Sequence, residues 1–351
     1  MEKKDNNKGG GYGFFAVIIV WSGLLWMILT YLPAGGGGGN FLASAVDNFN
    51  GRTESRSGII VFSEDGKDFK SAVLHFSRGV DIYDIERSAD KRLMFAASDR
   101  GLFISRDNGL NWHNFSDIEE KITPNAIVYG IHPKGFISVF RAGKGFLYKS
   151  EDNFYSLKTV LELDNEAVYG FDVSGDRIYL GLSDGKLMVY SLKKNTFRLL
   201  KTFSGPVKSV KVAGNGLIYL TLKNGGLWAS ADGENFSRRE FLSGYRGAEQ
   251  INSFSFGYEN DFSIYAATAY GLIRSLNSGL NWQNFKTLPS EQKEVSAVGL
   301  SFSEIYAASG GKIYKSADNG LSWRIIDPEV GGRQISLIKI YDGKIIVGTK
   351  D

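Results

Sequence analysis

Cysteine is absent from the 351 residues, and histidine occurs only three times, at His75, His113 and His132. The chain therefore forms no disulfide bond and offers no thiolate to a metal ion. The histidines are not spaced as a metal-binding pair, and no His-Glu-x-x-His motif occurs. We therefore expect no metal site and no cofactor.

A strong charge of one sign is also missing. The 41 Lys and Arg residues nearly balance the 38 Asp and Glu residues, which gives a net charge of +3 at pH 7. The two signs are mixed along the chain, without a polybasic run. Proteins that bind nucleic acid usually concentrate basic residues on one face or in one segment. The sequence therefore predicts no nucleic-acid partner.

Proline is rare, with 6 residues, but one short phrase, Ser-x-Asp-x-Gly-x-x-Trp, recurs along the chain. It is complete at 105–112 and 316–323, and Asn277 takes the Asp position in the copy at 275–282. Copies at 63–69 and 230–236 are shorter and end in Phe, and degenerate copies begin at residues 150 and 191. The serines are 39 to 45 residues apart. Such a period indicates a β-propeller with one four-stranded blade per repeat.

The recurring phrase has the chemistry of a hairpin turn. Asp accepts hydrogen bonds from nearby backbone N–H groups, and Gly adopts positive φ without steric cost. The closing aromatic ring packs back over the sheet, so we expect a structural role for the whole phrase. The residues assigned to it are Asp65, Ser105, Asp107, Gly109, Trp112, Asp232, Asn277, Trp282, Asp318, Gly320 and Trp323.

Each repeat also contains a short apolar segment that we expect to form the innermost strand. Its seven copies lie at 82–85, 128–131, 168–171, 207–210, 251–254, 295–298 and 335–338. Residues 335–349 supply two inner strands without outer ones, and residues 58–75 supply two outer strands without inner ones. The sequence therefore predicts an all-β, seven-bladed propeller over 58–351, closed by two strands from each end, which leaves no exposed sheet edge.

The N-terminal region predicts a membrane anchor. Residues 14–32 carry no charge and are long enough for a transmembrane helix. Lys3, Lys4 and Lys8 precede this run, and no Lys or Arg follows before Arg52, so the tail 1–13 is expected in the cytoplasm and the propeller outside. Residues 33–57 are expected to form a Gly-rich stalk. The alternative is secretion after cleavage near residues 43–45, which read Ala-Ser-Ala.

The phrases at 105–112, 275–282 and 316–323 resemble those of Asp-box propellers, also called bacterial neuraminidase repeats. That group includes sialidases, two-propeller xyloglucanases, sortilin-type domains and photosystem II assembly and stability factor-like proteins. The resemblance covers most of residues 58–351 and implies the fold more strongly than the function. The layout is most similar to the assembly-factor branch, whose members bind proteins and catalyse nothing.

A membrane-anchored module that binds a protein partner at the outer face is therefore the first functional hypothesis. We expect the binding surface on the face where the innermost strands begin, because loops on a rigid ring carry binding residues and Tyr and Arg anchor interfaces. Ser296 and Ser336 occupy equivalent positions on two further inner strands. The candidate binding residues are Arg78, Tyr83, Tyr129, Tyr169, Lys208, Tyr245, Arg246, Asn252 and Arg333.

A carbohydrate-binding or glycoside-hydrolase propeller is the alternative, with a glycan as ligand. Sialidase-type members carry an Arg-Ile-Pro motif, which this chain lacks, so the resemblance implies no catalytic residue here. A glycosidase needs two carboxylates about 5–9.5 Å apart over a sugar-sized cleft. The candidates for such a pair are Asp81, Asp84, Glu166 and Glu294.

Overall fold

The computed structural model describes residues 13–21, 24–32, 60–75, 79–115, 121–123, 125–240, 245–257, 262–285, 288–290 and 293–351. The chain divides into two compact units, Met1–Ser55 and Arg56–Asp351. In the first unit the described residues form two antiparallel strands, β1 (Gly13–Trp21) and β2 (Leu24–Leu32). Within the described parts of the chain, no helix has the length and apolar character that a membrane crossing requires.

These two strands occupy the segment for which the sequence predicted one helix over 14–32. The run is rich in aromatic and β-branched residues, such as Phe14, Phe15, Ile18 and Ile19, which favour extended backbone. An apolar run by itself does not separate helix from strand. The predicted cytoplasmic tail, apart from Gly13, and the predicted stalk at 33–57 lie outside the described residues.

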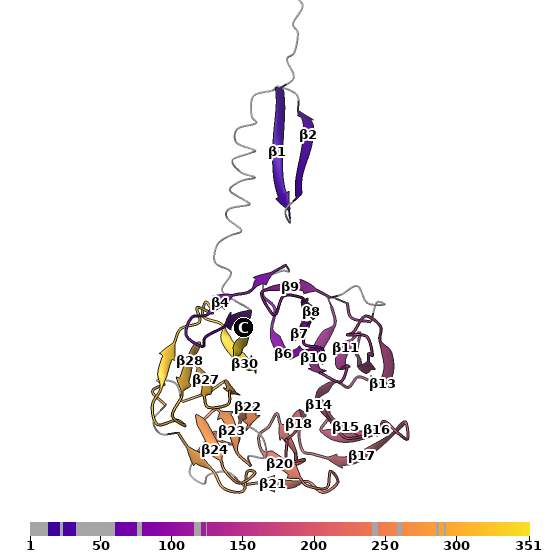
Figure 1. Ribbon diagram of the computed structural model, residues 1–351. Helices are drawn as coiled ribbons and strands as arrows, with labels where there is room; N and C mark the ends of the chain where they lie inside the picture. Colours follow the sequence, from indigo (N-terminus) through magenta and orange to yellow (C-terminus); the bar gives the residue numbers. More distant parts are fainter. Residues whose placement is uncertain are drawn as a thin grey trace, which may run out of the picture. The chain divides into compact units, whose positions relative to one another are not determined.

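The second unit is a seven-bladed β-propeller, in which each blade has four antiparallel strands around one axis and the sheet of one blade gains a fifth, parallel strand (Figure 1). We number the blades along the chain from the first complete sheet. Blade 1 contains β6 (Ile82–Arg87), β7 (Met94–Ser98), β8 (Gly101–Ser105) and β9 (Asn111–Asn114). Blade 2 contains β10 (Ile127–His132), β11 (Phe136–Arg141), β12 (Lys144–Lys149) and β13 (Lys158–Asp164). Blade 3 contains β14 (Val168–Ser174), β15 (Arg177–Leu182), β16 (Lys186–Ser191) and β17 (Thr196–Thr202).

The remaining blades repeat this order from the inside of the ring outward. Blade 4 contains β18 (Val207–Val212), β19 (Ile218–Leu222), β20 (Leu227–Ser230) and β21 (Ser237–Arg239). Blade 5 contains β22 (Ile251–Phe256), β23 (Ile264–Thr268), β24 (Leu272–Ser275) and β25 (Gln283–Asn284). Blade 6 contains β26 (Ala297–Leu300), β27 (Ile305–Ser309), β28 (Lys312–Ser316) and β29 (Arg324–Ile326). Blade 7 contains β30 (Gln334–Tyr341), β31 (Lys344–Lys350), β3 (Ile60–Ser63) and β4 (Lys70–Ser71).

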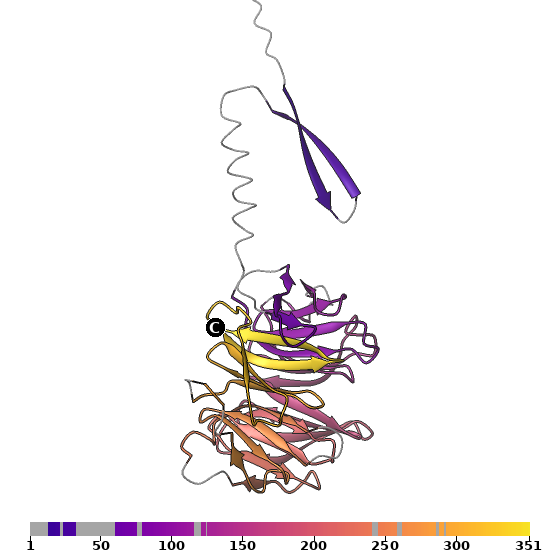
Figure 2. The same cartoon turned by 60° about the vertical axis from the view of Figure 1, so that its left-hand side comes forward.

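Blade 7 combines strands from the two ends of the propeller unit. β31 pairs with β3 in a register that runs from Ile60 opposite Gly348 to Ser63 opposite Ile345. The last strands of the chain, in yellow, accordingly lie beside the first strands of the propeller unit, in purple, in both Figure 1 and Figure 2. The sequence analysis assigned all of residues 58–75 to this blade, and that assignment is wrong for the last of them. The short β5 (Val73–Leu74) instead pairs in parallel with β9 of blade 1.

The inner strands share an irregularity that shapes the axis of the ring. Six of them, as far as the structure describes the chain, shift register at their second or third residue, between Ile82 and Asp84 in blade 1 for instance. Such a β-bulge leaves one residue outside the ladder and re-aims its side chain. The bulged residues are Tyr83, Tyr129, Tyr169, Lys208, Asn252 and Ser336.

The Ser-x-Asp phrases form compact turns between the third and fourth strands of their blades. In blade 1 the Ser105 hydroxyl donates to Asp107 at 2.8 Å and accepts from the N–H of Gly109, while Asp107 accepts from the N–H of Asn111. Asn108 and Gly109 both adopt positive φ, 57° and 88°, which explains the Asn-Gly pair. Asn277 accepts the equivalent bonds from Ser275 and from the N–H of Asn281 in blade 5, so an amide supports the same geometry.

The turn carboxylates predict an acid-sensitive propeller. Hydrogen bonds from the backbone of Asp68 and Lys67 lower the pKa of Asp65 to about 2, and bonds from Ser322 and Ser316 lower that of Asp318 to about 2. A lowered folded-state pKa adds stability above the unfolded value, near 4, and that stability is lost as the pH falls toward 2. We expect melting temperatures to fall steeply between pH 4 and pH 2 for this reason.

The double variant Asp65→Asn/Asp318→Asn should show a shallower fall over the same pH range. Its melting temperature at pH 7 should stay close to that of the wild type, because Asn277 already supports such a turn. Thermal melts followed by circular dichroism at half-unit pH steps measure both quantities. Parallel curves for the variant and the wild type would show that these turns do not set the acid sensitivity.

The apolar core lies between neighbouring sheets, and the closing aromatic residues of the turns enter it to different depths. Trp112 and Trp282 are buried, and their Nε1 atoms donate to the carbonyls of Gly109 and Gly279 at 3.0 Å. Trp323, which the sequence analysis expected to be buried, is only partly covered.

The reason is the ring of Phe285, which occupies the space over Gly320. An added Cβ at Gly320 would meet Phe285 Cε1 at 2.1 Å. At the equivalent Gly109, the tryptophan ring of the same turn is among the nearest atoms, with Trp112 Cζ2 at 3.8 Å. Trp323 is therefore displaced outward and meets the Phe285 ring edge-on, with centroids 5.9 Å apart.

Candidate functional site

A cavity of about 470 Å³ lies on the propeller axis, enclosed by the inner strands. Five of the bulged residues predicted as binding residues or their equivalents line it from blades 1 to 5, and Ser336 lines it from blade 7. Ser296, the equivalent residue of blade 6, is buried and donates to the carbonyl of Ala308. We call the end of the cavity where the bulged residues lie the channel mouth, defined by Tyr83, Tyr129, Tyr169, Lys208, Asn252 and Ser336.

Three tyrosines form an aromatic row on one side of the channel mouth. Tyr83 and Tyr129 are stacked, with ring centroids 5.8 Å apart, and Tyr169 meets Tyr129 edge-on at 4.9 Å. Burial raises the pKa of Tyr129 to about 12, and burial together with the nearby Asp99 and Asp81 raises that of Tyr83 to about 12. Both hydroxyls therefore stay protonated at physiological pH and are available as hydrogen-bond donors.

Lysines lie next to the tyrosine row. Lys208 is largely buried and donates from Nζ to the carbonyl of Ile251 at 2.8 Å. Burial, with added repulsion from Lys350 and Lys223, lowers its pKa to about 8, although Glu294 acts in the other direction. The Lys223 ammonium stands over the Tyr169 ring, 3.9 Å from its centroid. The Asn252 amide is held by Glu294 at 3.0 Å and by the carbonyl of Val295 at 2.9 Å.

The other end of the cavity contains a buried charge cluster. Lys339 lies between two carboxylates, with Nζ 2.9 Å from Asp84 and 2.5 Å from Glu86, and Tyr341 donates to Glu86 at 3.2 Å. Burial opposes the charge of Lys339, but Asp84 and Glu86 raise its pKa well above the ordinary value. The cluster is thus a compensated ion network that ties β6 of blade 1 to β30 of blade 7.

A histidine–carboxylate pair, formed by His132 of blade 2 and Asp172 of blade 3, also lines the cavity. His132 Nε2 is 3.0 Å from Asp172, and its Nδ1 accepts from the N–H of Lys134 at 3.1 Å. Although burial acts against it, bonding to His132 and the nearby Lys211 lower the pKa of Asp172. Both ring nitrogens of His132 are therefore engaged in contacts within the propeller.

The carboxylates considered for glycoside hydrolysis do not form a free acid and base. Asp84 is paired with Lys339, and Asp81 is bonded to Arg333 at 3.2 Å. Glu166, which precedes β14 of blade 3, pairs with Lys186 at 3.1 Å. Glu294 accepts a hydrogen bond from Asn252. A glycosidase requires one protonated carboxyl group and one free carboxylate over the sugar. Asp84 and Glu86 do converge in the cavity, but both contact the same lysine.

One sequence match to a nucleophile motif also has a structural explanation. Gly181–Gly185 reads Gly-Leu-Ser-Asp-Gly, which fits the Gly-x-Ser-x-Gly pattern of serine hydrolases. That pattern acts only at a strand-to-helix turn. Here it spans the hairpin between β15 and β16, where the Ser183 hydroxyl accepts from the N–H of Ala167 at 2.9 Å. Among the residues of the described ranges, no cluster of three His, Asp or Glu side chains suits a metal ion.

The predicted flanking residues have different environments. Arg78 lies outside the described residues. Tyr245 packs edge-on against Tyr270, with centroids 4.5 Å apart, so it supports the core of blade 5. Arg246 is exposed to solvent. Arg333 is largely covered, with 10% of its side chain exposed.

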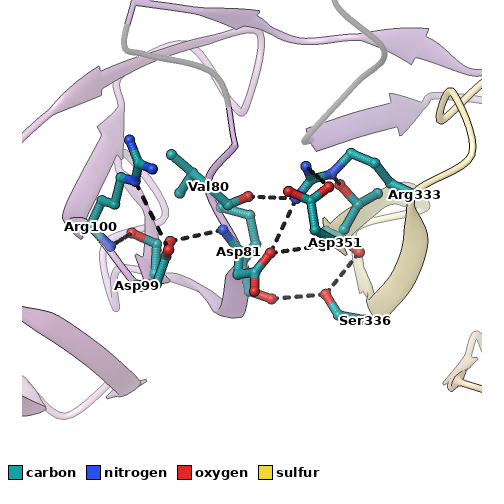
Figure 3. A network of polar contacts seen from close by, with 11 residues as sticks. Val80, Asp81, Asp99, Arg100, Arg333, Ser336 and Asp351 are labelled. Carbon is teal, nitrogen blue, oxygen red and sulfur yellow. Dashed lines mark hydrogen bonds and ion pairs between the residues drawn. The ribbon is translucent and has the colours of Figure 1, made fainter.

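Arg333 is the centre of a polar network between blade 7 and blade 1 (Figure 3). Its guanidinium donates to the carbonyl of Val80 at 2.9 Å, to Asp81 and to Asp351. Asp81 also accepts from the N–H of Asp351 at 2.8 Å, and its own N–H donates to Asp99. Arg333 was predicted as a binding residue, and its donors are engaged within the ring.

Two lysines beside the channel mouth, Lys223 and Lys350, were missed in the sequence analysis. Lys223 lies in the turn after β19, and Lys350 ends β31, so both stand where second strands end. In an antiparallel blade the second strand ends where the inner strand begins, and Gln334 indeed pairs with Lys350. This rule, applied to each repeat, would have added both lysines to the candidate surface.

Comparison with family models and with curated proteins gives no match. Among solved structures, the extracellular domain of BT4673 from B. thetaiotaomicron is similar, with a TM-score of 0.62 and 14% identity over 81% of this chain. This chain spans 39% of the length of that structure. The structure of YCF48 bound to D1 peptide has a TM-score of 0.60 and 12% identity, and the match covers 80% of this chain and 100% of that one. At these identities the comparisons establish a shared propeller fold.

Proposed function

We propose that this chain is a non-enzymatic binding module that recognises a protein partner with the face of the propeller that carries the channel mouth. The observation that carries the proposal is the set of β-bulges, which project tyrosine, lysine and asparagine side chains from successive inner strands into one opening. A rigid ring that presents aromatic and cationic side chains has the properties of an interface hot spot. YCF48, a propeller of the same fold, has been solved with a peptide bound.

The strand register places the start of the described propeller on the face that carries the channel mouth. Ile60 begins β3 opposite Gly348, and Gln334 begins the inner strand β30 opposite Lys350. The first residue of β3 therefore lies on the same face of the propeller as the channel mouth.

The anchor itself is also part of the proposal. An isolated two-stranded hairpin is marginally stable in water, and a bilayer favours the helix because it satisfies every backbone group within one segment. The uncharged run 14–32, preceded by three lysines, has the length for this. The BT4673 structure is an extracellular domain, which agrees with a propeller outside the cytoplasm. The Ser-x-Asp turns support assignment to the Asp-box propellers.

A pull-down from detergent-solubilised membranes tests the binding face. The double variant Lys223→Glu/Arg246→Glu reverses the charge of Lys223, which contacts Tyr169, and that of the exposed Arg246, which precedes the inner strand β22, and is expected to reduce partner recovery at least tenfold. The matched control Lys194→Glu/Arg324→Glu reverses two exposed charges, one in the turn after β16 and one on the outer strand β29. Both double variants should melt at the wild-type temperature, since all four substituted residues are exposed.

Equal recovery with both double variants would assign the binding site to another surface of the ring. The intact mass of the same membrane-extracted protein tests the anchor, because an uncleaved chain retains residues 1–32. A mature N-terminus after Leu32 would replace the anchored form by a secreted one.

A further inference from the structure

The channel mouth contains more hydrogen-bond donors than acceptors. Among the residues that the structure describes, no carboxylate lies within ion-pair distance of Lys208, Lys223 or Lys350. In the same described residues, the hydroxyls of Tyr83 and Tyr129 have no hydrogen-bond partner. A ligand that matches this opening must therefore supply acceptor atoms and negative charge.

The acidic residues near the mouth do not satisfy these donors, because each is engaged elsewhere. Asp81 accepts from Arg333 and from the N–H of Asp351. Asp99 accepts from the N–H of Asp81 at 2.8 Å. Glu294 accepts from Asn252 at 3.0 Å. The positive charge of the lysine side is thus left for a ligand.

We propose that the channel mouth binds a carboxylate group of the partner, with Lys208 and Lys223 as cationic donors and the tyrosine row as a stacking surface beside them. This inference rests on the proposed binding function of the same face. A partly buried lysine without an acidic partner is costly to keep charged, and a carboxylate that enters the opening removes that cost. The planar carboxylate and any adjoining ring or aliphatic group then lie against Tyr129 and Tyr169.

Lys208 also gives the interaction a pH dependence. A bound carboxylate stabilises the ammonium form and raises its pKa above the free value of about 8. Binding is therefore strongest below pH 8 and weakens as the pH rises through the free value. The charged groups that face Lys208 are Lys350 of β31, Lys223 after β19 and Glu294 before β26, and the two lysines add to the attraction for an anion.

The test follows the Lys208 resonance by NMR in full-length, detergent-solubilised protein labelled at the lysine ε-carbons, assigned by its loss in Lys208→Met. The probes are N-acetyl-tyrosine, with a terminal carboxylate, N-acetyl-aspartyl amide, with only a side-chain carboxylate, acetate, and N-acetyl-tyrosinamide, with none. The carboxylates should raise the titration midpoint of Lys208 by about one pH unit, which corresponds to tenfold tighter binding to the charged form. The neutral amide should leave it unchanged.

The arms of the experiment identify the source of the carboxylate. A larger rise with N-acetyl-tyrosine indicates a chain terminus, a larger rise with the aspartyl amide indicates an acidic side chain, and equal rises that include acetate indicate a small free carboxylate. Lys223→Met should weaken every carboxylate probe, whereas the exposed Lys194→Met should not. An unchanged midpoint, or an equal rise with the tyrosinamide, overturns the proposal. If Lys223→Glu/Arg246→Glu still reduces partner recovery in that case, the proposed binding function stands and only the proposed ligand chemistry is wrong.

Discussion

Deletion of residues 341–351 is expected to abolish the folded propeller and to yield aggregated protein. The deletion removes β31, whose Ile345, Ile346 and Val347 are at most 1% exposed. Each such side chain contributes roughly 2–4 kcal/mol, so three of them exceed much of the 5–15 kcal/mol that a domain has in total. The loss also leaves β3 and β30 without their shared neighbour, and unpaired edges invite association between chains.

Size-exclusion chromatography with light scattering and thermal melts measure this outcome. Deletion of residues 1–12, which removes a similar length of chain outside the propeller unit, serves as the control and should stay folded. A deleted protein that remains monomeric with unchanged melting would show that the sheet of blade 7 does not close the ring.

A disulfide across the same sheet tests the closure from the other direction. Val61 and Val347 are directly opposite one another in β3 and β31, and the chain has no other cysteine to compete. Opposite residues of an antiparallel pair have the Cα separation that a disulfide needs. The oxidised variant Val61→Cys/Val347→Cys should melt above its reduced form, with a gain of up to about 5 kcal/mol. Equal melting of the two forms would count against a closing role for this pair.

The propeller and its channel mouth were accessible to sequence reasoning because both repeat. A turn that needs Ser, Asp and Gly at fixed spacing signals itself in each blade, and an inner strand with the same pattern places its second residue at the same height each time. Tyr83, Tyr129 and Lys208 were therefore identified together although they are far apart in the chain. The structure adds that a β-bulge directs each of them inward.

What the sequence did not reveal depends on contacts between blades. Arg333 resembled an exposed anchor because its partners, Asp81 and Asp351, come from both ends of the propeller unit. Lys339 is paired across the same boundary with Asp84 and Glu86. No local pattern encodes the pairs across this boundary, since Asp81 and Glu86 are more than 250 residues from Arg333 and Lys339, respectively. The strands β1 and β2 were missed for a different reason, because an apolar run satisfies either backbone conformation.

Substitution of Trp112 by alanine is expected to reduce the free energy of unfolding by about 3–5 kcal/mol, the loss typical of a large aromatic side chain removed from a core. Trp112 is fully buried among Ile60, Met94 and Ile346, at the junction of blades 7 and 1. Its Nε1 bond to Gly109 would be lost as well.

The same substitution at Trp323 is the matched comparison, because the two residues close the same phrase in different blades. Trp323 is only partly buried, since Phe285 covers Gly320 in its place. We therefore expect Trp323→Ala to cost roughly 1–2 kcal/mol, from a smaller apolar area and one aromatic contact. Trp112→Phe should retain most of the stability that Trp112→Ala loses, because the buried Phe236 closes the equivalent turn of blade 4. Urea unfolding followed by far-ultraviolet circular dichroism, which reports on the backbone and not on tryptophan fluorescence, gives the free energy of unfolding of all three variants. Equal losses for Trp112→Ala and Trp323→Ala would mean that burial of the ring does not determine what the phrase contributes to stability.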